Sequence, residues 1–397
     1  PRRGGFAGRD LTQGSITRNL WSLAAPAMAE NFMDTLDTTI DMIWVGQLGP
    51  GAVAAVGVGG ILVRLISTAR MGLATGTRAI VSRCVGASDM PGANHAAMQT
   101  FVVSGIFAVV IAAIGVFFAE VMLRLVGLES RVIAEGLAYV RVAFVGSAFM
   151  SFRMMANSIL QASGDTLTPM KITTFIRILH IVIDPLLIFG WVGFPRLGVV
   201  GAAYANLITQ AIGAAIGLYV LFIGYSRVKM TFQKFRVDFV MIWRIVSIGI
   251  PSTVTGMERA LSATVMTGIA ASFGTYAVAA QSIVSRIQMI VMMMGMGGLA
   301  QAAAAIVGQN LGAGKPERAV KSTWVALGLY WLIMVVFGSA CLFRAEDIVH
   351  IFNSDPELVE VTSNWLKIGV VSFIFMPPAL LVSQVLGAGA GYTLPPM

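Results

Sequence analysis

Long apolar runs, separated by short segments rich in glycine, proline and charge, extend along the whole chain. A bilayer core of about 30 Å is crossed by about 20 apolar residues in a helix. Backbone amides in lipid must be satisfied within their own segment, and the runs lack the short strict alternation of barrel strands. The pattern predicts an all-α polytopic membrane protein with ten spanning helices, at residues 20–45, 52–79, 96–123, 134–159, 169–191, 198–222, 245–272, 276–307, 319–343 and 359–385.

Composition and charge support a membrane protein. Hydrophobic residues make up 57% of the chain and charged residues only 12%, whereas charged residues are about a quarter of a soluble chain. The positive-inside rule explains the net charge of +8 more simply than nucleic acid does, so no nucleic-acid partner is expected. We predict a bacterial or archaeal plasma-membrane protein with a cytoplasmic N-terminus, which places on that side the basic loop residues Arg78, Arg83, Lys171, Arg227, Lys229, Lys234, Arg236, Arg244, Lys315, Arg318 and Lys321.

The second part of the chain repeats the first at an offset of 225 residues. Pro26 matches Pro251, Gly49 matches Gly274, and the sequence AVAA recurs at 52–55 and 277–280. A constant offset across separate features indicates two six-helix bundles in tandem. Because ten helices are predicted, the last two are expected to be missing. The predicted organisation is an N-terminal lobe with helices 1–6 at 1–226, a cytoplasmic linker at 227–244, and a truncated C-terminal lobe with helices 7–10 at 245–397.

Four acidic residues lie on one stripe of the first predicted helix. Glu30, Asp34, Asp37 and Asp41 are spaced by 4, 3 and 4 residues, so they share a helical face. Each charged residue at mid-membrane costs roughly 2.5 to 3.5 kcal/mol on insertion scales, so the stripe must face water or partners. Two interpretations remain open: an acidic wall on a central cavity that attracts cations and exchanges protons, or purely structural pairing. The pairing partners would be Arg64 and Arg70 of helix 2 or Arg153 of helix 4.

The fifth predicted helix carries a second polar face. Arg177, His180 and Asp184 are spaced by 3 and 4 residues, directly before Pro185. Asn157 on helix 4 and Asn206 on helix 6 could complete a polar cluster with them. On helix 7, Glu258 adjoins Arg259, and the two could simply compensate each other. The predicted substrate-cavity residues are Glu30, Asp34, Asp37, Arg177, Glu258 and Gln281.

Signals of enzyme chemistry are weak in this sequence. The three histidines, His95, His180 and His350, form no HExxH or Cys-His metal spacing. The stretch 308–316 resembles a phosphate loop, but Gln309 stands where the first glycine belongs and Pro316 replaces Ser or Thr. We therefore expect neither an enzyme nor a bound cofactor or metal centre. The energy source should be an ion gradient or another subunit.

Several motifs, in order along essentially the whole chain, resemble the multidrug and toxic compound extrusion (MATE) transporters. They are DMIWVGQLG at 41–49, AVAAVG at 52–57, LQASGDT at 160–166, Asp184-Pro185 with GVVGAAYAN at 198–206, and VGQNLGAG at 307–314. The resemblance implies a twelve-helix antiporter whose two lobes enclose a V-shaped cavity. It also implies export of amphiphilic, often cationic compounds in exchange for H⁺ or Na⁺.

The resemblance also assigns roles to individual residues. Similar transporters have a cation-coupling cluster that maps onto Asp41 and Asp184, which could also hold Na⁺, and their helix 4 asparagine is retained as Asn157. Two positions depart from the pattern, since His180 replaces an expected asparagine and Asn206 an expected threonine. Histidine titrates near neutral pH, so proton coupling is preferred. Other branches use a glutamate on helix 7, which Glu258 resembles with a spacing from Pro251 that is one residue short.

The predicted function is a secondary antiporter that exports small organic cations from the cytoplasm by alternating access. Membrane lipid is its other expected partner, and the protein is expected to be monomeric. One alternative is a flippase for lipid-linked oligosaccharide from the same superfamily, which would favour a cationic cavity that holds pyrophosphate. The other is a non-transporting membrane scaffold.

Overall fold

The computed structural model describes residues 10–125, 130–233, 235–292 and 297–392. Within these ranges the chain is helical and contains no strand, which confirms the all-α fold class. The helices of the first half agree with the predicted spans to within a few residues. They are α1 (Ile16–Gly46), α2 (Pro50–Gly86), α3 (Met90–Leu125), α4 (Ser130–Ala162), α5 (Leu167–Phe189) and α6 (Val199–Ile223), with a 3₁₀ turn at Trp191–Gly193 after α5.

The second half departs from the predicted spans in three places. The single predicted span 276–307 corresponds to two helices, on either side of residues 293–296, which lie outside the described part of the chain. A short helix not predicted from the sequence, α11, precedes the last long one. A π-helical turn, Val385–Gly389, follows that helix. The helices are α7 (Phe239–Ser272), α8 (Thr275–Met292), α9 (Gly298–Gly312), α10 (Pro316–Phe343), α11 (Ala345–His350) and α12 (Pro356–Gln384).

The start of α7 lies inside the predicted linker 227–244. Asp238 caps this helix: its Oδ1 accepts hydrogen bonds from the backbone N–H groups of Val240 (2.9 Å) and Met241 (3.0 Å). Such a cap satisfies N–H groups that the helix itself leaves free, so the helix begins earlier than its apolar run. The remaining linker is held on α3, where Gln99 accepts from Asp238 N–H and donates to the Arg236 carbonyl.

Within the described residues, six helices are long and apolar enough to cross a membrane: α3, α4, α5, α6, α7 and α10. The helix α1, which carries the four carboxylates, is not among them because polar side chains lower its mean hydropathy. The repeat predicted from the sequence is visible in α1 and α7. Each is a long helix with an internal proline, Pro26 in α1 and Pro251 in α7.

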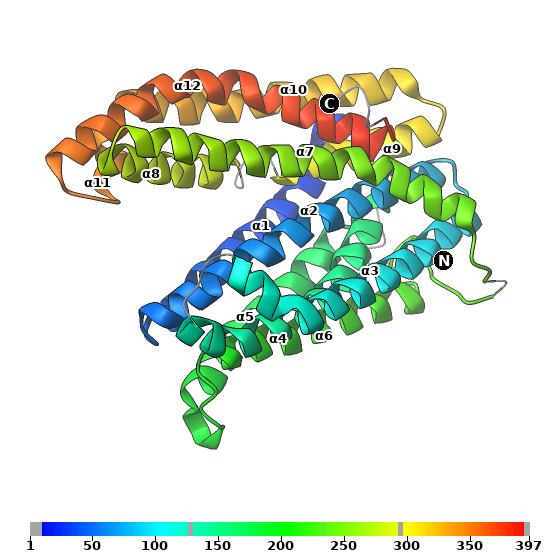
Figure 1. The fold of residues 1–397 in the computed structure, drawn as a ribbon. Coiled ribbons are helices and arrows are strands. Elements are labelled where there is room, and N and C mark those ends of the chain that lie inside the picture. Colours follow the sequence, from blue (N-terminus) through cyan, green and yellow to red (C-terminus); the bar gives the residue numbers. More distant parts are fainter. Residues whose placement is uncertain (1–9, 126–129, 234, 293–296, 393–397) are drawn as a thin grey trace.

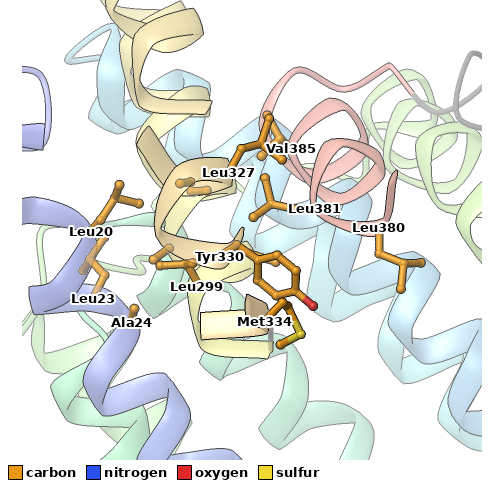
Figure 2. Close-up of a cluster of buried hydrophobic side chains, with 14 of the residues drawn as sticks. Leu20, Leu23, Ala24, Leu299, Leu327, Tyr330, Met334, Leu380, Leu381 and Val385 are labelled. Atoms are coloured by element: carbon orange, nitrogen blue, oxygen red, sulfur yellow. The ribbon is translucent and has the colours of Figure 1, made fainter. Parts of the chain in front are cut away.

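The helices form two groups that cross at an angle (Figure 1). Helices α7, α8, α10 and α12 run across the top of the view, whereas α1 to α6 slant below them. The first part of α1 belongs to both groups. Its Leu20, Leu23 and Ala24 lie in one buried apolar cluster with residues of α9, α10 and α12, including Tyr330 (Figure 2).

The two groups meet closely at one end of α2. Gly76 of α2 lies against the Ile245 carbonyl of α7, and a Cβ added at Gly76 would overlap it. Further along α2, Gly86 lies against the Gln309 carbonyl of α9, with the same result. Only residues without a side chain allow helices to approach this closely. We call this set of contacts the glycine seam.

Hydrogen bonds accompany the glycine seam at the same end of the helices. The Gln309 side chain donates to the Ala162 carbonyl of α4 at 2.8 Å, and Arg83 of α2 donates to the Ala390 carbonyl. Lys315 and Arg318 donate to carbonyls of the segment before α1. The two halves are therefore joined at the helix ends that carry most of the basic loop residues.

Candidate functional site

The middle of the first lobe contains a buried ion network between α1 and α5. Arg177 Nε lies 2.7 Å from Asp34 Oδ1, and Arg177 Nη1 lies 2.7 Å from Asp37 Oδ2. His180 Nδ1 lies 2.7 Å from Asp37 Oδ1. Asp37, Arg177 and His180 are buried, whereas the Asp34 side chain is 35% exposed. The 3-residue spacing within each helix places these groups opposite one another.

This network changes the expected partners of the acidic stripe. Arg177 pairs with Asp34 and Asp37 of the stripe, and the described helix 2 and helix 4 arginines, Arg70 and Arg153, form no ion pair with it. Arg70 donates to the Ser147 carbonyl at 2.8 Å, and Arg153 donates to Gln210 at 2.8 Å. The side chain of Arg64 lies outside the described part of the structure. The reason is geometric, because α5 packs directly on α1 along the stripe, and spacing alone does not reveal which helix faces it.

Glu30 forms a second polar site at the other end of the stripe. Its Oε1 accepts hydrogen bonds from Asn157 (2.7 Å) and Thr173 (3.0 Å), and its Oε2 accepts one from Gln161 (3.2 Å). Asn157 therefore lies with Glu30, although the sequence analysis grouped it with Asp41 and Asp184. Gln161 was missed there, yet it belongs to the quoted motif at 160–166 and follows Asn157 by one helical turn, so the helix 4 face could have identified it.

Asp41 of α1 and Asp184 of α5 form the third polar site. Their carboxyl groups interact electrostatically with each other. Asp41 Oδ1 and both Asp184 carboxyl oxygens are buried and receive no hydrogen bond from any described residue. Two neighbouring carboxylates repel each other when both are ionised, and one proton or cation between them relieves that repulsion. This pair is therefore a candidate site for a proton or a small cation.

The other predicted site residues lie apart from these three sites. Asn206 is half-buried on α6, and its side chain forms no hydrogen bond within the described residues. Glu258 on α7 is exposed, and Gln281 on α8 is half-buried. Of the six predicted substrate-cavity residues, the structure brings together the four on α1 and α5. Three of these four, Glu30, Asp37 and Arg177, are buried in the lobe interior.

Comparison with known proteins identifies the family to which this fold and these sites belong. The sequence model of the MatE family matches residues 26–186 and 251–397, most of both halves. The chain belongs to the MatE family. It is therefore a multi-pass membrane protein, and its relatives are transporters.

Two relatives illustrate the range of this MATE family. The chain is 27% identical over 393 residues to a "Probable multidrug resistance protein NorM" of Thermotoga maritima, which covers 96% of this chain and 82% of the relative. It is 26% identical over 363 residues to a "FAD transporter" of Shewanella oneidensis, which covers 90% of this chain and 79% of the relative. Proteins of this family thus carry names with chemically different substrates.

Solved structures confirm the MATE fold. An outward-facing multidrug resistance MATE transporter of the MOP superfamily superposes with a TM-score of 0.90 at 24% identity, covering 99% of this chain and 88% of that chain. A MOP superfamily transporter from Pyrococcus furiosus superposes with a TM-score of 0.88, also at 24% identity, with the same coverage. The sequence-based recognition of a MATE transporter is confirmed.

Proposed function

We propose that this protein exports amphiphilic organic cations from the cytoplasm in exchange for H⁺, or alternatively Na⁺, by alternating access. The observation that carries the proposal is the Asp41–Asp184 pair, whose buried oxygens lack a donor among the described residues. Of the polar sites in the first lobe, this pair gains most from taking up a cation.

The neighbouring ion network supports this choice of coupling site. Arg177 balances one of the charges of Asp34 and Asp37, a protonated His180 would balance the other, and each of these groups has a partner at 2.7 Å. An added cation would therefore gain little there. Among the described residues, Asp41 and Asp184 have no such counter-charge in direct contact, although His180 acts on both through space. Protonation of His180 thus connects the network to the coupling pair, which is why H⁺ is preferred over Na⁺.

Alternating access requires two arrangements of the lobes, and the glycine seam supports one of them. The lobes are joined at the helix ends that carry the basic loops, and these ends are cytoplasmic under the positive-inside rule. We propose that this arrangement opens outward, and that the seam separates to open inward. Coupling then requires that cation and drug differ in affinity for the two arrangements.

The experiment is efflux of ethidium by cells that lack their own efflux pumps and express the full-length protein. Asp41→Asn and Asp184→Asn keep the side-chain volume but remove the shared cation site, so each should reduce efflux to the level of cells without the protein. Asp347→Asn, at an exposed carboxylate on α11, is the matched control and should leave efflux unchanged. Normal efflux by both Asp41→Asn and Asp184→Asn would show that these two residues are not the coupling site.

The coupling ion is tested by changing the external pH and the Na⁺ concentration separately. Proton coupling predicts that efflux follows the pH gradient at constant Na⁺, and that ethidium releases protons from purified protein. If efflux follows the Na⁺ gradient at constant pH, Na⁺ is the coupling ion. A flippase would show neither response, because its cargo is a lipid-linked anion.

A further inference from the structure

A polar pocket lies where the two lobes meet, beyond the glycine seam. It has a volume of about 80 Å³ and is lined by residues of α2, α7 and α12. On α2 it begins at Thr75, next to Gly76 of the seam. This volume has room for a few heavy atoms, such as a carboxylate group, and not for a whole drug molecule. The pocket involves none of the three polar sites between α1, α4 and α5.

The pocket presents hydrogen-bond donors that have no partner among the residues described. Ser252 and Arg259 of α7 line it together with Ser383 and Gln384 of α12. The side chains of these four residues form no hydrogen bond or ion pair with any residue that the structure describes. Arg259 is exposed, and Ser252, Ser383 and Gln384 are half-buried, so none of the four is closed off in the interior.

Arg259 gives the pocket its electrostatic character. Among the described residues that line it, Arg259 alone is charged. The helix α7 is apolar enough to cross a membrane, where an arginine is costly and marks a functional site by default. Glu258 adjoins Arg259 and acts on it electrostatically; both residues are exposed, but only Arg259 lines the pocket. A guanidinium with unpaired donors recognises carboxylate and phosphate oxygens.

The internal repeat connects Arg259 with the acidic stripe of the first lobe. At the offset of 225 residues, Pro26 corresponds to Pro251 and Asp34 corresponds to Arg259. Asp34 is the partly exposed member of the ion network. Equivalent positions on α1 and α7 therefore carry opposite charges.

We propose that this pocket is a binding subsite for the anionic group of a zwitterionic, amphiphilic cargo. The physiological role of the subsite rests on the proposed export function. Its binding preference does not, because binding is measurable without transport.

The test uses two dyes that differ at the relevant group. Rhodamine 110 is a zwitterion with a free carboxylate, and rhodamine 123 is its methyl ester and a simple cation. Their binding to the purified full-length protein is followed by fluorescence anisotropy. Arg259→Gln should weaken rhodamine 110 binding by about tenfold or more, because a charge-assisted hydrogen bond is lost, and should leave rhodamine 123 within about twofold. Arg259→Lys, which keeps the positive charge, should weaken rhodamine 110 binding less than Arg259→Gln does.

Two kinds of variant control for folding. Arg286→Gln removes an exposed arginine of α8 that does not line the pocket. It should leave the binding of both dyes unchanged. Ser383→Ala and Gln384→Met remove donors without changing charge, and each should weaken rhodamine 110 alone by about two- to tenfold. The melting temperature and elution volume of Arg259→Gln show whether this variant folds. If it does not, the Ser383→Ala and Gln384→Met variants still test the proposal.

The inference is overturned if the wild-type protein does not bind rhodamine 110, or if the pocket variants weaken both dyes equally. Equal weakening would mean that Arg259 serves only to balance Glu258. The proposed function fails separately, if cells expressing the protein export neither ethidium nor rhodamine 123 while the dye preference in binding persists.

Discussion

The two lobes share a helical repeat but differ in what fills their interiors. In the first lobe, α1 and α5 enclose carboxylates, Arg177 and His180 in contacts of 2.7 Å. In the second lobe, the buried cluster around Tyr330 is apolar, with alanine and leucine from α9, α10 and α12. On α7, Met266 occupies the position equivalent to Asp41. The repeat thus preserves the helix architecture, whereas the carboxylates of the proposed coupling site belong to the first lobe.

The largest effect on stability is expected from a substitution in the ion network of the first lobe. Asp37→Leu leaves buried His180 without its carboxylate partner and leaves Arg177 with Asp34 alone, which should lower the free energy of unfolding by about 3 to 5 kcal/mol. Thermal unfolding of the purified protein measures this loss. Replacing both members of the exposed pair Arg124–Glu120 should change stability by less than about 1 kcal/mol.

A companion variant separates structure from transport in the same network. The combination Asp37→Leu, Arg177→Met and His180→Phe replaces the buried charges by apolar side chains of similar volume, and such exchanges are often neutral for stability. We expect recovered stability with lost ethidium efflux. Efflux at the wild-type level would mean that the network only holds α1 against α5.

A substitution in the apolar core of the second lobe should change stability through packing alone. Leu299 is fully buried in that cluster (Figure 2), and Leu299→Ala should cost about 2 to 5 kcal/mol by leaving a cavity. Because no charge changes, the loss should be the same with and without ethidium and across neutral pH values. A pH-dependent loss would contradict the division of chemistry between the lobes.

The glycine seam joins the two lobes. Replacing one of its glycines with alanine adds a methyl group and tests whether the close approach of the helices stabilises this arrangement. Gly76→Ala places a Cβ on the Ile245 carbonyl, so it should destabilise this arrangement by about 1 to 3 kcal/mol. The opposite arrangement should then become more populated, by about tenfold. The accessibility of a cysteine introduced beside the seam measures this shift. Gly328→Ala on α10, where an added Cβ meets nothing within 4 Å, is the control.

The smallest effect is expected at the linker between the lobes. The hydrogen bond from the Met241 N–H, together with His95, lowers the pKa of Asp238 below its usual value. A depressed carboxyl pKa contributes stability that is present at neutral pH and is lost as the pH falls below about 4. The wild-type protein should melt at a slightly higher temperature than Asp238→Asn at pH 7, and this difference should vanish in acid. A difference that persists at low pH would assign the effect to packing.

The acidic stripe shows how far sequence reasoning reaches into the site. The 4, 3, 4 spacing correctly placed Glu30, Asp34, Asp37 and Asp41 on one helical face, because the period of a helix is a local property. It did not predict that they divide into three sites with different partners: amides at Glu30, a guanidinium at Asp34 and Asp37, and a second carboxylate at Asp41. The partner of each group depends on which residue of α4 or α5 packs opposite it.

The sequence by itself determined the helical membrane architecture, the tandem repeat and the MATE family, since all three follow from local hydropathy, from internal spacing and from motifs. Tertiary structure decided that Arg177 pairs with Asp34 and Asp37, that Asn157 binds Glu30, and that α1 shares its first turns with the core of the second lobe. It also created the pocket at Arg259, whose lining comes from three helices far apart in the chain. Such contacts depend on how helices pack across the lobe boundary, and no periodicity within one helix encodes that packing.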